Sequence, residues 1–291
     1  MNSIPLLCYN CGELNHTSKM CTNPIYSYGI IAIKVNTFDT YYKLLQCINK
    51  SIIEIENLTS NAELLMIQRN YSYCFLWFIK GIEVENQNFE YLKPIWEKIT
   101  EKEQLMIKNM KPEGFKNLWK SIWKTKSNKI YKKNEYDKAY NLFHVFFQNK
   151  YLKERLFQIP SICKELEWGF PKGRRLRNKK YLKQESNLEC AKREFHEETN
   201  YSEEDYIILN NNETYKEFFY GSDGIQYAHE YYIALILWEN TTIPKITYNN
   251  YEVNNIKWLT DLENIYIYQS SRNKIIQSLW KLKKFFKMNV I

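Results

Sequence analysis

The 291-residue sequence has no apolar run long enough to cross a membrane. Its longest uninterrupted apolar stretch, residues 231–238, is far shorter than the ~20 residues that a spanning helix needs. The first residues lack the basic start and apolar core of a secretory signal, so we expect an intracellular protein. Four of the seven cysteines are widely scattered and three lie near the N-terminus, which favours one metal site over a disulfide framework.

The composition is that of an ordinary globular protein. Hydrophobic residues make up 44% and charged residues 25%, enough apolar surface for a core. There is no internal repeat and no low-complexity linker, and the length suits one large domain or two modest ones. The formal net charge of +8 favours a polyanionic partner.

Hydrophobic periodicity predicts strands, then helices, then strands again. Strands are expected over residues 29–35, 63–69 and 73–79, followed by helices across about 89–158. After residue 160 we expect strands at 167–170, 215–220, 227–238 and 252–259, and helices at 186–198 and 271–287. Ser186 and Glu189 have the spacing of a capping box at the start of the first of these helices, and Gly-Ser-Asp-Gly at 221–224 predicts a hairpin turn. Strands on both sides of a helix, closed by a terminal helix, predict an α/β sandwich with a helical insertion.

Three glutamates share one face of the helix expected over residues 186–198. Glu194 lies three residues before Glu197 and four before Glu198, so the three side chains are neighbours on that helix. Like charges this close repel one another. A divalent cation offsets the repulsion, and carboxylate oxygens suit hard ions such as magnesium. A solvated acidic helix face is the alternative.

The surrounding residues resemble the Nudix box, G-x5-E-x7-R-E-U-x-E-E-x-G-U, where U is aliphatic or aromatic. Residues that match the box in register are Glu185, Arg193, Glu194, Phe195, Glu197, Glu198 and Tyr201. Eleven residues rather than five separate Gly173 from Glu185, and Asn200 replaces the second glycine. The resemblance implies that Arg193 and Glu185 form an ion pair that braces the loop–helix–loop.

What the resemblance implies for metal binding can be stated residue by residue. Glu194 and Glu198 would bind Mg²⁺ or Mn²⁺, with the Gly173 carbonyl as a further ligand. Glu197 would be a ligand or the general base that activates water. The implied fold is α+β, a Nudix α/β/α sandwich with a large helical insertion and a small N-terminal zinc knuckle.

Further segments resemble the mRNA-decapping Nudix enzymes. WGFPKG at 168–173 and CAKRE at 190–194 are similar to their W-x-x-P-K-G and C-A-x-R-E. EVNNIKW at 252–258 is similar to their E-I-x-x-I-x-W, whose glutamate supplies another metal ligand or base, so Glu252 is a fourth candidate. An exposed loop glutamate is the alternative there. The helical insertion also resembles that of decapping proteins of large cytoplasmic DNA viruses.

The insertion carries a dense group of positive charges. Nine lysines and one acid, Glu113, lie between residues 108 and 133. An apolar helix face opposite a lysine face could hold an RNA backbone, whereas a merely solvated surface normally mixes both signs. Another acid-free run covers residues 172–183. The candidate RNA-binding lysines are Lys116, Lys120, Lys124, Lys126, Lys129, Lys132, Lys133 and Lys172.

The N-terminal segment has the spacing of a zinc knuckle. Cys8, Cys11, His16 and Cys21 follow the Cys-x2-Cys-x4-His-x4-Cys pattern, and four such ligands suit tetrahedral zinc. The segment resembles retroviral nucleocapsid knuckles, which implies that Tyr9 stacks on an unpaired base. A knuckle as a protein contact is the alternative.

Together these features predict four regions and one activity. The regions are a knuckle at 1–24, the first Nudix part at 25–84, an RNA-binding helical insertion at 85–160 and the catalytic Nudix part at 161–291. The expected reaction removes the 5′ cap of mRNA, releasing 7-methylguanosine diphosphate and 5′-monophosphate RNA, in the host cytoplasm if the chain is viral. Capped mRNA is the expected partner, and the oligomeric state stays open. The alternatives are hydrolysis of diphosphoinositol or dinucleoside polyphosphates, and a catalytically inert RNA-binding protein.

Overall fold

The computed structural model of the chain divides into two compact units with separate cores. The first comprises Met1–Ile67, Trp168–Asn250 and Ile256–Ile291, and the second comprises Gln68–Glu167 with Tyr251–Asn255. The residues that the structure describes are 8, 10–11, 13–17, 20–59, 62–81, 88–123, 133–176, 185–210, 212–220, 225–244 and 252–260.

A mixed sheet is the centre of the first unit. The strands of the described residues are β1 (Ile25–Lys34), β2 (Glu63–Arg69), β3 (Trp168–Gly169), β4 (Lys172–Gly173), β5 (Tyr206–Ile208), β6 (Tyr215–Tyr220), β7 (Gln226–Ile236) and β8 (Val253–Leu259). Their order is β3-β2-β1-β7-β5, with β4 on β1, β6 on β7 and β8 on β2. β1 and β7 are parallel, whereas β6 and β7 pair antiparallel. The long apolar runs of β1 and β7 are typical of strands that are buried on both faces.

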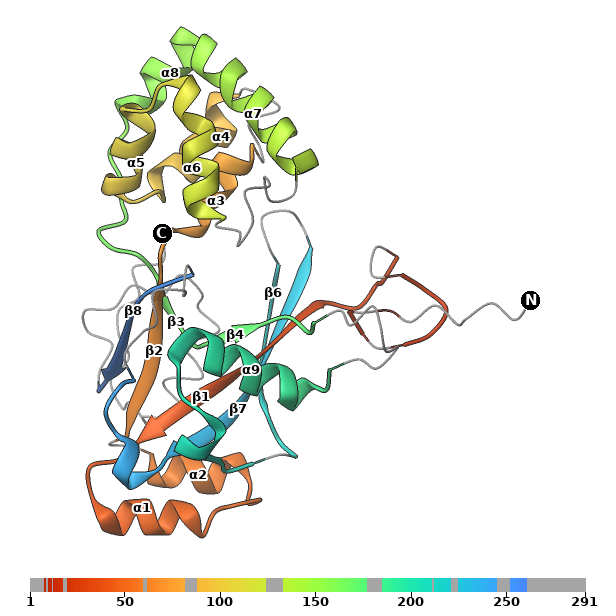
Figure 1. Cartoon of the computed structure of the whole chain (residues 1–291), viewed down its shortest axis with the longest axis vertical. Helices are drawn as coiled ribbons and strands as arrows, with labels where there is room; N and C mark the ends of the chain where they lie inside the picture. The colour runs from red at the N-terminus through yellow and green to blue at the C-terminus, as the bar shows by residue number, and fades with distance from the viewer. Residues whose placement is uncertain are drawn as a thin grey trace. The chain divides into compact units, whose positions relative to one another are not determined.

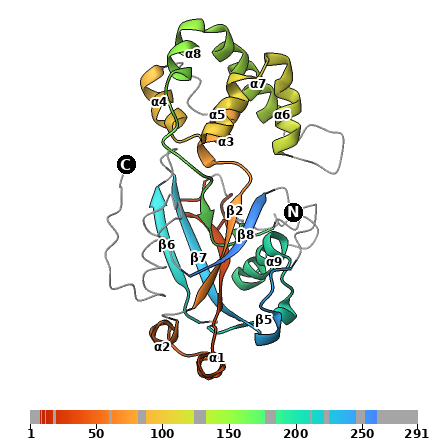
Figure 2. The same cartoon turned by 90° about the vertical axis from the view of Figure 1, so that its left-hand side faces the viewer.

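Helix α9 (Asn187–Thr199) lies along this sheet, and two further helices lie at the lower end of the sheet (Figure 1; Figure 2), where they pack against its opposite face. These two are α1 (Phe38–Leu45) and α2 (Ile52–Leu58). Ile31 and Ile33 of β1 share a core with Ile55 of α2. Because side chains alternate along a strand, the buried Ile30 and Ala32 face the opposite side, where α9 packs against β1 and β7. The predicted Nudix α/β/α sandwich is therefore confirmed.

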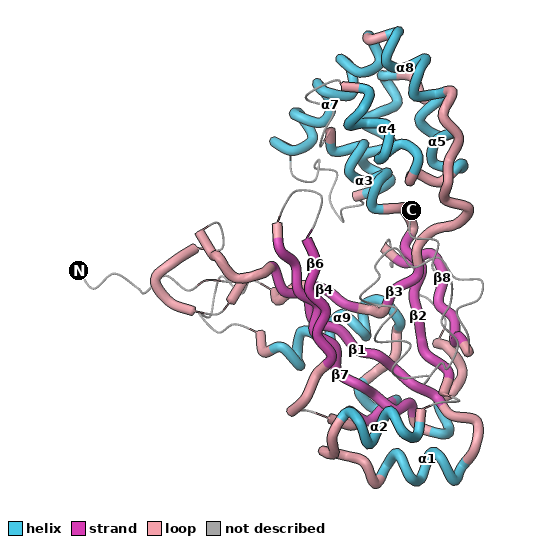
Figure 3. The backbone as a smooth tube through the Cα atoms, turned by 180° about the vertical axis from the view of Figure 1, so that it is seen from behind, coloured by secondary structure: helices cyan, strands magenta, loops and turns pink. Residues whose placement is uncertain are grey.

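The second unit is helical (Figure 3). Its helices are α3 (Tyr73–Lys80), α4 (Phe89–Glu97), α5 (Glu101–Lys108), α6 (Phe115–Ile122), α7 (Lys133–Gln148) and α8 (Lys150–Phe157). Aromatic rings fill its core: the Phe115 and Phe143 centroids lie 4.6 Å apart. The apolar face of α6 points into this core, because Phe115, Leu118, Trp119 and Ile122 are all buried.

The strand predicted over residues 73–79 is wrong, because this segment is helix α3. The Ser72 side chain accepts a hydrogen bond from the Phe75 amide and so caps the helix, which ends at Gly81 with φ 73°. The buried carboxylate of Glu103 holds this start, since it accepts from the Ser72 amide at 2.7 Å and hydroxyl at 2.8 Å. A short apolar run fits a buried strand or a buried helix, and the tertiary partner decides.

Two predictions of local structure concern residues outside the described ranges. They are the C-terminal helix over residues 271–287 and the hairpin turn at 221–224. The strands on both sides of that turn pair as predicted, with Tyr220 opposite Gln226. Among the described helices, none is long and apolar enough to cross a membrane.

Candidate active site

Helix α9 spans Asn187–Thr199, within one residue of the predicted 186–198 at each end. Ser186 accepts from the Glu189 amide, and the Glu189 carboxylate accepts from the Ser186 amide at 2.8 Å, a complete capping box. The helix ends at Asn200, whose φ of 63° is a conformation that asparagine adopts more readily than most residues. Cys190 and Phe195 are buried on the inner face, and the charged Glu198 is buried as well.

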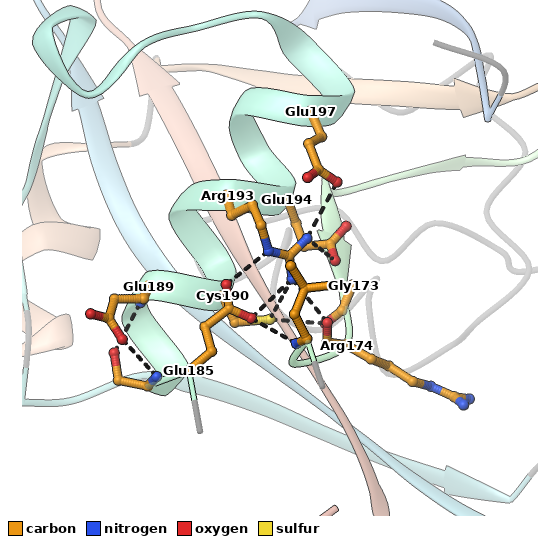
Figure 4. Close-up of polar contacts among 10 residues, drawn as sticks. Gly173, Arg174, Glu185, Glu189, Cys190, Arg193, Glu194 and Glu197 are labelled. Atoms are coloured by element: carbon orange, nitrogen blue, oxygen red, sulfur yellow. Dashed lines mark hydrogen bonds and ion pairs between the residues drawn. The ribbon is translucent and has the colours of Figure 1, made fainter. Parts of the chain in front are cut away.

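Arg193 lies at the centre of a charged network beside this helix (Figure 4). Its Nε and Nη2 donate to the two oxygens of Glu185 at 2.8 and 3.0 Å. Its Nη1 donates to Glu194 at 2.7 Å and to Glu197 at 3.3 Å, and Nη2 also reaches the Arg174 carbonyl at 3.0 Å. One guanidinium therefore joins Glu185 and the Arg174 backbone, which precede α9, to two of the three glutamates on the helix. The predicted ion pair between Arg193 and Glu185 is part of this network.

These contacts shift the pKa values of both partners of the ion pair. Burial opposes the charged form of each, but the Glu185 and Glu194 carboxylates raise the pKa of Arg193 above its ordinary value. Hydrogen bonds from Arg193 and from the Leu176 amide, in turn, lower the pKa of Glu185. Both groups are therefore charged at neutral pH.

Strand β4 brings Gly173 directly against Glu194. A Cβ atom at Gly173 would overlap the Glu194 carboxylate, so only glycine leaves room for that side chain in its present position. Gly29 of β1 allows β4 to approach β1 closely in the same way, because a Cβ atom at Gly29 would overlap the Pro171 carbonyl. Two close backbone approaches thus place the Gly173 peptide next to a carboxylate.

Glu198 is held differently from the other two glutamates. It is only 7% exposed and accepts a hydrogen bond from the Lys172 amide at 2.8 Å. The Glu197 side chain, by contrast, is 56% exposed. Glu198 is therefore fixed to β4, while Glu197 lies on the open side of the helix.

The carboxylate set fits a divalent cation in its chemistry. Glu194, Glu197 and Glu198 supply hard oxygen ligands on one helix, and the glycine at 173 opens space beside one of them. Their oxygens are turned to Arg193 and the Lys172 amide. Within the described residues, only the N-terminal Cys/His group gathers its ligand atoms within 4.8 Å of one another. An ion shared by the three carboxylates therefore requires their side chains to rearrange.

Glu252 and the lysines belong to other parts of the chain. Glu252 is exposed just before β8, and its carbonyl accepts from the Asn70 amide at 3.0 Å. Lys116 and Lys120 lie on the exposed side of α6, and Lys133 is exposed at the start of α7. The other lysines predicted for the insertion, Lys124, Lys126, Lys129 and Lys132, lie outside the described residues.

The N-terminal cysteines and histidine converge as a metal site. Cys8, Cys11, His16 and Cys21 place one ligand atom each within 4.8 Å of the others, and Cys11 Sγ lies 3.3 Å from His16 Nε2. Burial opposes ionisation of Cys21, but hydrogen bonds from Asn10 and His16 lower its pKa to about 6. A thiolate-forming Cys3His set suits zinc. Tyr9, the predicted stacking residue, lies outside the described residues.

Sequence reasoning missed a buried group on the other face of the sheet. Glu217 of β6 is hydrogen-bonded to His229 of β7, and the Tyr231 hydroxyl donates to the same carboxylate at 3.1 Å. The hairpin register pairs Glu217 with His229, so a derivation of the register from the turn could have found the pair. Tyr231 belongs to the core shared with α1 and α2, so this group lies opposite α9.

Sequence reasoning also missed Asn10 and Arg175, which connect the knuckle to the loop after β4. Arg175 Nη2 donates to the Asn10 carbonyl at 2.9 Å. The sequence gives no signal for this contact, because 164 other residues separate the two. Only the richness of residues 174–183 in arginine and lysine marks this segment of the sequence as unusual.

Helix α9 packs against the central strands of the sheet. Beside Gly173, the last residue of β4, Arg193 joins Glu185 to Glu194 and Glu197. This fold and this network together are those of a Nudix hydrolase. Comparison with known proteins narrows the class. The mRNA-decapping protein g5R of African swine fever virus (isolate Pig/Kenya/KEN-50/1950) is 32% identical over 188 residues, which cover 62% of this chain and 69% of g5R. An mRNA-decapping protein homologue of Acanthamoeba polyphaga mimivirus is 28% identical over 87% of each chain.

The chain belongs to the family of viral mRNA-decapping proteins, and it is a Nudix pyrophosphohydrolase. The zinc knuckle family matches residues 7–23, which include all four ligands of the N-terminal site. A solved structure of a C. elegans Ap4A hydrolase covers 89% of this chain and 87% of its own, at 10% identity and a TM-score of 0.33.

Proposed function

We propose that this protein removes the 5′ cap of mRNA, releasing 7-methylguanosine diphosphate and leaving RNA with a 5′ monophosphate. The main support is that the similar proteins of African swine fever virus and mimivirus are named as mRNA-decapping proteins. The Arg193-centred network beside Gly173 supports it, because a pyrophosphate hydrolase needs carboxylates held in fixed positions. The viral relatives also favour action in the cytoplasm of the host cell.

Glu194, Glu198 and the Gly173 carbonyl would hold Mg²⁺ or Mn²⁺, with Glu252 as a further candidate. A cation bound there would neutralise the phosphate chain and lower the pKa of a bound water. Glu197 is exposed on the open side of α9, where it can take the proton of the attacking water. Arg193 orients Glu194 and Glu197, while the Lys172 amide fixes Glu198. The proton from water thus ends on Glu197 and the leaving group is the RNA 5′ phosphate.

The decisive experiment uses RNA that is radiolabelled in the cap. The full chain is incubated with it in Mg²⁺, and the released nucleotide is identified by chromatography. Release of 7-methylguanosine diphosphate is expected, and a Glu197→Gln variant should lose about 10²–10⁴-fold in rate. Glu204→Gln, which removes an exposed acid outside the network, is the matched control. Another labelled product, or full activity of Glu197→Gln, contradicts the proposed reaction or the proposed base respectively.

We further propose that the knuckle (1–24) and the helical insertion (85–160) hold the RNA body, while regions 25–84 and 161–291 form the hydrolase. The exposed Lys116 and Lys120 on α6 support this role for the insertion, and Lys172 is the corresponding candidate beside the site. Changing Lys116 and Lys120 together to Gln should lower the salt dependence of RNA affinity by about one unit of slope per lysine. Lys102→Gln, on α5 between two acids, is the control.

Substrate competition separates capped mRNA from small diphosphates. Uncapped RNA should inhibit decapping, and the free cap dinucleotide should be a poor substrate, because most binding energy would come from the RNA body. Efficient hydrolysis of diphosphoinositol or dinucleoside polyphosphates, with kcat/KM above that of capped RNA, would instead identify a small-molecule diphosphatase. Intact RNA binding with no hydrolysis of any of these would identify an inert RNA-binding protein.

A further inference from the structure

The zinc knuckle and the loop that follows β4 are joined through one side chain. Arg175 Nη2 donates to the Asn10 carbonyl at 2.9 Å and to the Tyr28 hydroxyl at 2.8 Å. The guanidinium also lies 5.0 Å from the centre of the Tyr28 ring. Tyr28 is only 3% exposed and belongs to β1, so Arg175 is anchored on the sheet while it contacts the knuckle.

Asn10 continues this connection to the zinc ligands. It lies between Cys8 and Cys11 in the chain, and its side-chain amide donates to the Cys21 sulfur at 3.3 Å. The same amide donates to the Pro24 carbonyl at 2.8 Å, directly before β1. Hydrogen bonds to a ligating atom orient it and tune its basicity, so Asn10 would sense whether Cys21 binds metal.

The loop continues the connection to the catalytic helix. The Arg174 carbonyl accepts from Arg193 Nη2 at 3.0 Å, while the Arg174 side chain points away from the network (Figure 4). Arg193 in turn contacts Glu194 and Glu197. Consecutive residues of one loop therefore contact the two proposed metal sites, Arg174 through its backbone and Arg175 through its side chain.

We propose that Arg175 is a positioning residue that couples zinc binding in the knuckle to divalent-metal binding at α9. Zinc fixes the Asn10 backbone, Arg175 then fixes the loop, and the Arg174 carbonyl holds Arg193 and the glutamates in register. This inference rests on the proposed metal site of α9. Coupling between two sites is reciprocal, so metal at α9 must also slow zinc loss.

The size of the coupling follows from the contacts. One charge-assisted hydrogen bond, from Arg175 to the Asn10 carbonyl, joins the loop after β4 to the knuckle. The same loop is also held at Leu176, whose amide donates to Glu185. We therefore expect an effect at the low end of allosteric couplings, about 5- to 10-fold in affinity. Mn²⁺ has little preference for a thiolate-rich site, so its binding reports on the carboxylates rather than on the emptied knuckle.

The test measures Mn²⁺ affinity by electron paramagnetic resonance of the free ion, on the full chain with and without zinc. The wild type should bind Mn²⁺ about 5- to 10-fold more weakly after zinc removal. Arg175→Ala should bind weakly in both states. Arg174→Ala is the matched control, because it loses the same charge from the neighbouring residue but retains the carbonyl, and it should respond to zinc as the wild type does.

A second readout is the rate of zinc transfer to a chromogenic chelator. Arg175→Ala should release zinc several-fold faster than Arg174→Ala, and Mn²⁺ should slow release in Arg174→Ala but not in Arg175→Ala. Circular dichroism ensures that both variants are folded. Equal Mn²⁺ affinities with and without zinc in the wild type, or the same zinc response in both variants, overturn the coupling while the α9 metal site stands. A wild type that binds no Mn²⁺ in either state refutes the metal site and the coupling together.

Discussion

Gly173→Ala should separate catalysis from stability. The added Cβ would overlap the Glu194 carboxylate, which is the far end of a flexible side chain. Glu194 can therefore turn aside at the cost of one unfavourable rotamer, about 0.5–1.5 kcal/mol. The carboxylate then moves by about 1 Å or more, and a misplacement of that size can reduce turnover by about 10²-fold. We expect weaker Mn²⁺ binding and a large loss of kcat/KM in a stably folded protein.

Gly29→Ala is the contrasting variant. Its Cβ would meet the Pro171 carbonyl, which is backbone and cannot turn aside. Overpacking of this kind costs about 1–3 kcal/mol, which lowers Tm by roughly 2–12 °C at about 2–4 °C per kcal/mol. Thermal unfolding and Mn²⁺ titration are measured on both variants. A Gly173→Ala protein that binds Mn²⁺ and cleaves capped RNA like the wild type would falsify the placement of the metal beside Gly173 and Glu194.

Three other predictions concern single groups. Arg193→Lys keeps the charge but loses the paired contact with Glu185, so kcat/KM should fall by at least about tenfold with KM little changed; an unchanged rate would show that the network is dispensable. Because the pKa of Glu185 is lowered on folding, its ion pair stabilises the protein above the ordinary glutamate value of 4.5, and the effect is lost as the pH falls through the lowered value; the stability difference between wild type and Glu185→Gln, measured in denaturant titrations, should therefore shrink steadily as the pH falls below 4.5, and a constant difference would contradict the role of the ion pair. Glu217→Ala leaves the buried His229 without its carboxylate partner and should cost about 1–3 kcal/mol of unfolding free energy with activity preserved, whereas no loss of stability would show that the pair does not stabilise the fold.

Local signals in the sequence predicted the parts of the site that lie close together in the chain. The capping box of Ser186 and Glu189 marks the start of α9, and the 3.6-residue period places the three glutamates on one face. The knuckle ligands are predictable for the same reason, because all four fall within fourteen residues. In each case neighbouring residues alone determine the geometry.

Contacts between distant segments were not predictable. No sequence pattern predicts that the Lys172 amide holds Glu198, because the donor is a backbone N–H, which every residue except proline has. The contact between Arg175 and Asn10 depends on where the knuckle packs against β1. The misassigned segment at 73–79 has the same cause, since its helical state depends on Glu103 of another helix. Tertiary partners decide such cases, and sequence patterns do not contain them.

The hydrogen bond between Glu198 and the backbone of β4 has a consequence for protein engineering. Every side chain at position 172 presents the same N–H, apart from proline, so ordinary mutagenesis at that position leaves the anchor of Glu198 intact. Only chemical synthesis reaches it: an ester in place of the amide between residues 171 and 172 deletes the donor and keeps every side chain. A semisynthetic protein of that kind isolates the contribution of one main-chain atom to the alignment of a proposed metal ligand.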